Sequence, residues 1–175
     1  MNCVLNVEPE LKAELWAHLL PDAESHEQAA FLFCTPAEPD TDLKIEVVGS
    51  ALLQAHDFAA QETDYLELSD TARIRVIKRA HHLGASLVEL HSHPGPWPAA
   101  FSLADRSGLR ATVAHMQWRL RGRPYIAIVV APSGFDSLVW RQHARIPEPL
   151  AGIQVGETLL LPTNNSLEGW DSDRF

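Results

Sequence analysis

Apolar residues recur at helical intervals in three stretches of the chain, which cover 9–20, 69–84 and 102–122. This spacing places the apolar side chains on one face of a helix and predicts three amphipathic helices. Residues that favour helix ends bound the stretches: Pro21 follows the first, and Gly84 closes the second. The hydrophobic pattern therefore predicts helices that each cover one side of a core.

Short apolar runs between these helices predict β-strands. The expected strands cover 29–34, 43–48, 86–91, 125–131 and 137–143. Pro132-Ser133-Gly134 is typical of a turn and should join the last two strands as a hairpin. Helices interspersed with strands predict an α/β fold, and the absence of a Gly-rich phosphate loop argues against a doubly wound nucleotide fold.

The length of 175 residues, 46% of them hydrophobic, suits one domain with a core of its own. We expect that domain to cover 1–145. The stretch 146–175 is rich in Pro, Gly, Asn and Asp and carries one apolar patch, so it is predicted to be an irregular tail.

Charge and cysteine content narrow the partners and the compartment. Lys and Arg total 14 against 23 Asp and Glu, which gives a formal net charge of −9. This balance repels phosphate backbones and anionic lipid, so neither nucleic acid nor a membrane is an expected partner. Cys3 and Cys34 have no CxxC spacing, and the chain shows no basic and apolar leader. A cytoplasmic protein with buried, inert cysteines is expected.

The segment around His91 and His93 carries the candidate chemistry. Residues two apart on a strand face the same side, so both imidazoles can project together at the end of the strand 86–91. Asp105 would return on the first turn of the following helix and supply an anionic oxygen. Three protein ligands leave a fourth position free, which is the arrangement of a catalytic zinc site.

Residues close to this segment have two open interpretations. Ser102 and Asp105 fit a helix capping box, and Ser102 could equally donate a hydrogen bond to an oxyanion near the metal. Trp97 and Phe101 either pack in the loop or contact a substrate, and the sequence does not separate these roles.

The run HSHPGPWPAAFSLAD resembles the HxHx(7)Sx(2)D signature of the JAMM (MPN-type) zinc metalloproteases, with one extra residue between His93 and Ser102. The family also carries an upstream glutamate in a pattern similar to ExxGxLxG, and Glu27 stands in that place here, with Ala30 for the usual Gly. The order of the predicted elements over 8–143 matches as well. The resemblance implies a cytidine-deaminase-like fold with a mixed, mostly antiparallel sheet flanked by helices.

The same resemblance implies a zinc-dependent isopeptidase or peptidase of bacterial type. Zinc bound by His91, His93 and Asp105 would activate a water, Glu27 would be the general base, and Ser102 would stabilise the oxyanion. Other candidates for the base are Glu89, on the same strand face as the histidines, and then Glu24.

The implied substrates are a ubiquitin-like protein or its conjugates, cleaved at the C-terminus of the modifier. Enzymes that activate or conjugate this modifier are further expected partners. The segment 64–68 lies where the family presents a strand or loop to the modifier's extended end. Two alternatives stay open: a catalytically silent scaffold of the same fold, and a hydrolase of small-molecule amides or cysteine adducts.

Overall fold

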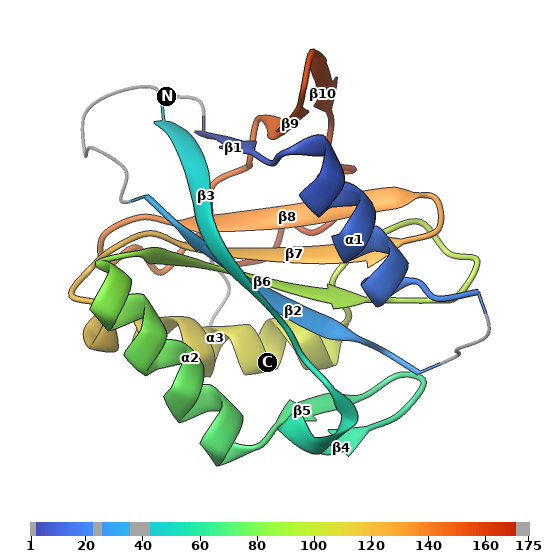
Figure 1. Ribbon diagram of the computed structural model, residues 1–175. Helices are drawn as coiled ribbons and strands as arrows, with labels where there is room; N and C mark the ends of the chain where they lie inside the picture. The colour runs from blue at the N-terminus through green and yellow to red at the C-terminus, as the bar shows by residue number, and fades with distance from the viewer. Residues whose placement is uncertain (1–2, 23–25, 36–42, 171–175) are drawn as a thin grey trace.

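The computed structural model describes residues 3–22, 26–35 and 43–170, and Figure 1 shows an α/β arrangement in which helices cover both faces of a sheet. The helices are α1 (Pro9–Leu19), α2 (Asp70–Leu83) and α3 (Leu103–Arg119). The strands are β1 (Cys3–Asn6), β2 (Ala29–Cys34), β3 (Leu43–Leu52), β4 (Phe58–Gln61), β5 (Leu66–Leu68), β6 (Ser86–Ser92), β7 (Tyr125–Ala131), β8 (Gly134–Trp140), β9 (Gly152–Val155) and β10 (Thr158–Leu160). No helix in these ranges is long and apolar enough to cross a membrane.

Eight strands form one mixed sheet in the order β10-β9-β1-β3-β2-β6-β7-β8, and β4 pairs with β5 separately. The pairs β10–β9, β3–β2, β2–β6 and β7–β8 are antiparallel, whereas β9–β1, β1–β3 and β6–β7 are parallel. The long strand β3 joins the two halves, because its first residues pair with β1 and its later residues pair with β2. The sheet is therefore mixed and mostly antiparallel, as expected.

The core consists of two apolar clusters, one on each face of the sheet. Along β6, Leu87 points toward α2 and α3, whereas Val88 and Leu90 point toward α1. Helix α1 contributes Leu15 and Leu19, both fully buried, to its cluster. Burial of one such side chain contributes about 1.5–3 kcal/mol. Central strands covered on both faces explain why β2 and β7 are continuous apolar runs.

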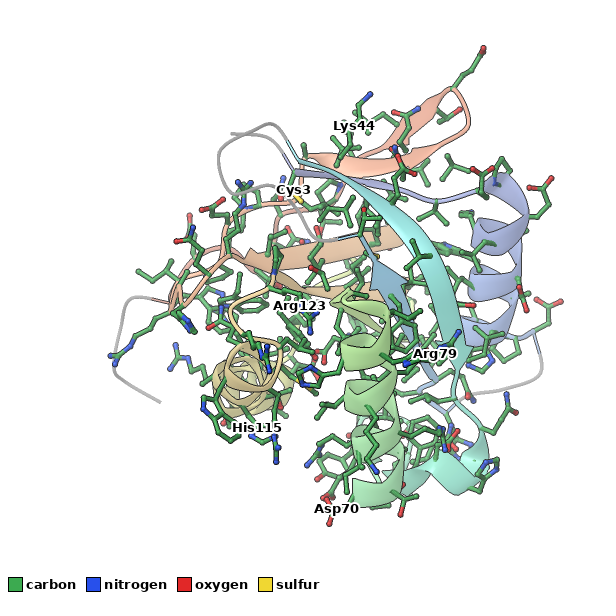
Figure 2. The ribbon with its side chains drawn as sticks, turned by 60° about the vertical axis from the view of Figure 1, so that its left-hand side comes forward. Cys3, Lys44, Asp70, Arg79, His115 and Arg123 are labelled. Carbon is green, nitrogen blue, oxygen red and sulfur yellow. The ribbon has the colours of Figure 1, made fainter. Side chains whose placement is uncertain are left out.

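Helix α2 has the ends that its sequence predicts. Ser69 is the N-cap, with its Oγ accepting from the Ala72 amide at 3.2 Å, and Gly84 ends the helix in the left-handed region with φ of 60°. Arg79, labelled in Figure 2, extends from this helix to β3, where it donates to the Ser50 carbonyl at 2.7 Å. Gly49 makes room for it, since an added Cβ there would lie 3.0 Å from the guanidinium.

The predicted strands 29–34 and 125–131 match β2 and β7. The prediction 137–143 is wrong by three residues, because the hairpin turns at Pro132-Ser133 and pairs Ala131 with Gly134 directly. Strand β3 continues four residues past the predicted end to Leu52, since its later part gains β2 as a partner.

The prediction of an irregular tail over 146–175 is wrong where β9 and β10 form, whereas 161–170 contain no helix or strand. Strand β9 pairs in parallel with β1, and β10 pairs with β9, so both belong to the main sheet. Trp170 is buried in the cluster beneath α2 and α3. Strand β1, which the sequence analysis did not predict, is the strand that pairs with β9.

Both cysteines are buried and free, as expected. Burial raises the pKa of Cys3 to about 11 and that of Cys34 to about 12. The thiolate is the reactive form, so neither residue is a nucleophile near neutral pH.

Substitution of two glycines by alanine, one in the C-terminal hairpin and one in α3, should have opposite effects on the free energy of unfolding. A Cβ at Gly152 would lie 2.6 Å from the Leu160 carbonyl oxygen, whereas a Cβ at Gly108 in α3 meets nothing within 4 Å. We expect Gly152→Ala to lower the free energy of unfolding by about 1–3 kcal/mol through overpacking. Gly108→Ala should raise it by about 0.8–1 kcal/mol through helix propensity. Urea unfolding measures both, and equal effects would contradict the close packing of β9 on β10.

Candidate metal centre

His91 and His93 are placed by the end of β6. His91 pairs with Ala29 of β2 and Val129 of β7, so neighbouring strands hold its backbone on both sides. Strand-like hydrogen bonding continues past the strand end, since the His93 amide donates to the Val130 carbonyl at 2.8 Å. Both rings therefore project from fixed backbone toward the face that α2 and α3 cover.

Asp105 is placed by the first turn of α3. Ser102 is the N-cap, and its Oγ accepts from the Asp105 amide at 3.1 Å. In return, Oδ2 of Asp105 accepts from the Ser102 amide at 2.7 Å. This reciprocal capping box fixes the carboxylate, which would otherwise rotate freely at a helix start.

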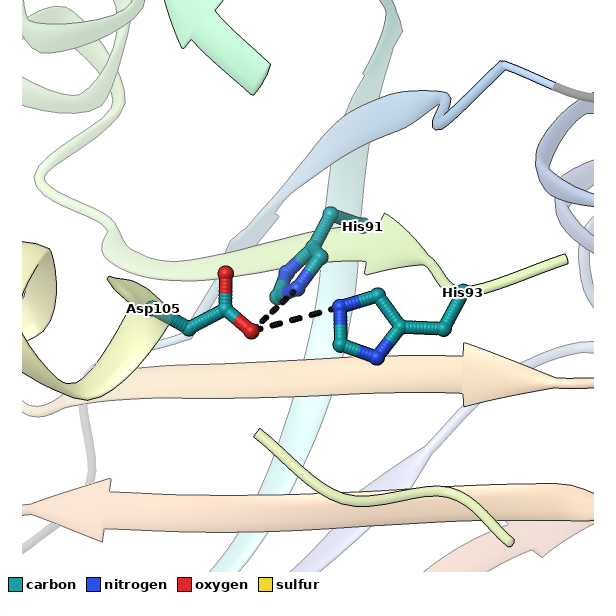
Figure 3. A group of neighbouring side chains, drawn as sticks. All are labelled: His91, His93 and Asp105. Atoms are coloured by element: carbon teal, nitrogen blue, oxygen red, sulfur yellow. Dashed lines mark ion pairs between the residues drawn. The ribbon is translucent and has the colours of Figure 1, made fainter. Parts of the chain in front are cut away.

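The structure brings these three side chains together, as Figure 3 shows. Oδ2 of Asp105 lies 3.2 Å from Nε2 of His93 and 3.5 Å from Nε2 of His91, and the three ligand atoms all lie within 4.8 Å of one another. Ligand atoms at about 2.0–2.1 Å from a tetrahedral zinc lie roughly 3.3–3.5 Å apart. Nε2 of His91 is buried with no hydrogen-bond partner, as expected of a metal ligand. The donor set thus fits a metal ion.

The electrostatics of the trio favour positive charge between its members. Burial by itself lowers the pKa of His91, but the Asp105 carboxylate, together with Glu27 and Glu89, raises it above the usual value. Burial by itself raises the pKa of Asp105, but the two histidines lower it well below the usual range. A field that attracts a proton here also attracts a metal cation, which competes with that proton for His91.

Glu27 lies beside the trio without belonging to it. Its Oε1 is 3.5 Å from Nε2 of His93, and the residue is 4% exposed. The hairpin β4–β5 holds its backbone: the Glu27 amide donates to the Glu62 carbonyl at 3.0 Å, and Gln61 donates to the Glu27 carbonyl at 2.9 Å. Burial raises the pKa of Glu27, partly offset by His91 and His93. A buried carboxylate with a raised pKa beside the three side chains is chemically able to accept a proton.

The two competing glutamates differ from Glu27. Glu89 shares the strand face of His91, as expected, but its carboxylate accepts a hydrogen bond from the Tyr125 hydroxyl. Burial raises the pKa of Glu89, and this hydrogen bond opposes the rise. Glu24 lies outside the described residues. Among the described glutamates, Glu27 alone is close to His93.

Three residues between His93 and α3, for which the sequence left two interpretations open, differ in their surroundings. Ser102 caps the helix, so that interpretation is confirmed, while its oxyanion role stays a prediction. Phe101 is buried with its ring centroid 5.7 Å from that of His91, which is packing. Trp97 is 77% exposed, and its role in substrate contact stays a prediction.

A cavity of about 300 Å³ adjoins the trio and includes His91 and Asp105 in its wall. Residues 64–68, which include β5, contribute to its lining, and helix α3 contributes Ala104, Gly108, Leu109, Thr112 and Met116. Sequence reasoning expected 64–68 near a substrate but missed the contribution of α3. The signal was available: a glycine within a helix, which costs stability unless the space is needed.

No protein-family model matches the chain, and no curated protein has a significantly similar sequence. The assignment of chemistry therefore depends on the geometry of the site.

We expect about one Zn²⁺ per purified chain and its loss in Asp105→Ala, because two imidazoles alone leave the ion without its anionic ligand. Free zinc at 100 times its Kd should stabilise the parent by about 2.7 kcal/mol, measured as a shift of the urea midpoint. His115→Ala is the matched control, because His115 is an exposed histidine on α3 (Figure 2). Equal zinc content in Asp105→Ala and the parent would contradict the ligand assignment.

Proposed function

We propose that this protein is a zinc-dependent isopeptidase or peptidase with the cytidine-deaminase-like fold of the JAMM (MPN-type) metalloproteases. The observation that carries the proposal is the convergence of His91, His93 and Asp105 beside the buried carboxylate of Glu27. Three protein ligands and an adjacent base are what metal-assisted hydrolysis of an amide requires. We further propose that it acts in the cytoplasm.

The chain's own residues supply the proton transfers. A zinc ion held by the trio would act as a Lewis acid and lower the pKa of a bound water to about 7. Oε1 of Glu27 accepts the proton of the attacking water and delivers it to the nitrogen of the leaving amine. Its raised pKa, caused by burial, makes it a better proton acceptor than an ordinary carboxylate. Burial also keeps bulk water from competing for that proton.

Ser102 is suited to the oxyanion that forms when water adds to the carbonyl. Its Oγ accepts from the Asp105 amide, and a hydroxyl that accepts one hydrogen bond keeps its own proton for donation. The residue is exposed beside the trio, so a substrate can approach it. One such donor is typically worth about 2.7–4 kcal/mol of transition-state stabilisation.

The cavity supports a polypeptide substrate. Strand β5 pairs with β4 alone among the described strands, and residues 64–68 line the cavity that reaches the trio. An extended peptide can add to such an edge through its backbone. We propose the C-terminus of a ubiquitin-like protein, free or in a conjugate, as that peptide, with the activating or conjugating enzymes of the modifier as further partners.

Two other functions make different predictions. A hydrolase of small-molecule amides or cysteine adducts would use the same trio and Glu27 but would not need residues 64–68. A silent scaffold would need neither Glu27 nor the metal. The buried position of Glu27, which carries a desolvation cost, argues against the scaffold, because a binding surface gains nothing from it.

Glu27→Gln should lower the rate of hydrolysis about 10²–10⁴-fold, because the amide accepts no proton, while zinc content stays at the parental level. The assay is cleavage of a ubiquitin-like fusion, with elemental analysis on the same sample. Glu157→Gln, in an exposed turn, is the matched control for the change itself. Unchanged cleavage in Glu27→Gln would remove Glu27 from the mechanism, and Glu89→Gln would then be tested as the next candidate.

Cleavage should also depend on the folded modifier. Replacement of the modifier by its last few residues removes remote binding energy, so kcat/KM should fall steeply. The comparison uses one scissile bond in two contexts, the full fusion and the short peptide. Equal kcat/KM for both would favour the small-molecule hydrolase.

A further inference from the structure

The C-terminal clamp, which we define as residues 163–170, is attached to strand β8 at both of its ends. At one end the Thr163 amide donates to the Phe135 carbonyl at 2.9 Å. At the other end Trp170, 7% exposed, lies edge-on to Trp140 with ring centroids 5.5 Å apart. The clamp is therefore a fixed part of the domain.

Between these ends the clamp is hydrogen-bonded to the loop 94–101, which connects the histidine pair to α3. Oγ of Ser166 accepts from the Phe101 amide at 2.8 Å, and Ser166 is only 1% exposed. The indole of Trp170 in turn donates to the Ser166 carbonyl at 2.7 Å. The Phe101 ring packs on His91, so the hydrogen bond from Phe101 to Ser166 indirectly positions a candidate metal ligand.

The clamp also forms hydrogen bonds with the same loop at Ala99, which is fully buried. Its carbonyl accepts from Oγ1 of Thr163 at 2.7 Å and from Nδ2 of Asn165 at 3.2 Å. A buried carbonyl needs such partners, because an unpaired one carries a desolvation cost. Both ends of the loop segment 99–101 are thus bound to the clamp.

The clamp also holds the helix that carries Asp105. Arg106, the next residue, donates to a carbonyl of the clamp, and Arg110 donates to the Gly169 carbonyl at 3.2 Å. The guanidinium of Arg106 lies 4.9 Å from the centroid of the Trp170 ring, a cation–π contact. One short segment therefore contacts both halves of the metal centre.

We infer that the C-terminal clamp sets the separation between the histidine pair and Asp105, and that Ser166 is a positioning residue for the metal. This deepens the proposed function and rests on its metal site. Without the clamp, the loop 94–101 would lose its hydrogen bonds to Thr163, Asn165 and Ser166. Metal binding would then have to supply the free energy that orders the loop, so the affinity for the metal would fall. Groups that hydrogen-bond a ligand directly typically change metal affinity 10–100-fold, and Ser166 acts one residue further from the metal.

The test is Ser166→Ala in the full chain, with Zn²⁺ affinity measured by competition with a chelating dye. We expect about 10-fold weaker binding, at the lower end of the range for groups that bond a ligand directly. We also expect altered d–d bands in the Co²⁺-substituted protein, because these bands report ligand geometry rather than stability. Ser133→Ala, in an exposed turn, controls for the loss of a hydroxyl. Ile45→Val, in the cluster on the opposite face, controls for destabilisation alone.

Parental affinity and parental Co²⁺ bands in Ser166→Ala would overturn the inference and leave the proposed function standing. Equal weakening by Ile45→Val would overturn it as well. A parent that binds neither ion would overturn both the inference and the proposed function. If Ser166→Ala does not fold, Thr163→Val with Asn165→Ala removes both donors to Ala99 from exposed positions and carries the same expectations.

Discussion

Oxygen Oδ2 of Asp105 links the start of helix α3 to the histidines at the end of strand β6. It accepts the Ser102 amide at 2.7 Å and lies within 3.5 Å of Nε2 of both His91 and His93. The start of a helix favours a negative charge, so the carboxylate is held as an anion by its own helix before any metal binds. The capping box that holds Asp105 at the helix start therefore also places its carboxylate beside the two histidines. The three candidate ligands are close together without a metal ion.

The same arrangement concentrates charge that needs a cation. Asp105 and Glu27 are partly or fully buried near one another, and the presence of Asp105 contributes to the raised pKa of Glu27. Burying carboxylates without a compensating charge is costly. The histidines offset this in part, and a divalent ion between His91, His93 and Asp105 would offset it more completely. The buried Glu27 carboxylate and the three candidate ligands are therefore more favourable together, with a cation between the ligands, than any of these charges would be alone.

The sequence predicted what depends on near neighbours. Periodicity located α2 and β7, and the short spacing from His91 to Asp105 was enough to propose three ligands, because a strand end and a capped helix start have fixed local geometry. It ranked Glu27 ahead of Glu89 through the resemblance alone, since the contacts that distinguish the two glutamates are made with the distant hairpin β4–β5 and with Tyr125. Strands β9 and β10 were missed for the same reason: each is short, and β1 stabilises β9 from the other end of the chain.

The shape of the cavity bears on what the trio would act upon. Ala104, Gly108 and Thr112 recur every fourth residue on the side of α3 that faces the cavity, and Leu109 and Met116 of the same helix also line it. A glycine in the middle of a helix costs about 0.8–1 kcal/mol relative to alanine, and no neighbour at Gly108 requires it. Residues 64–68 also line the cavity, and β5 within them pairs with β4 alone among the described strands. The helical glycine beside the cavity and the strand residues in its lining are the features on which the proposal of an extended peptide substrate rests.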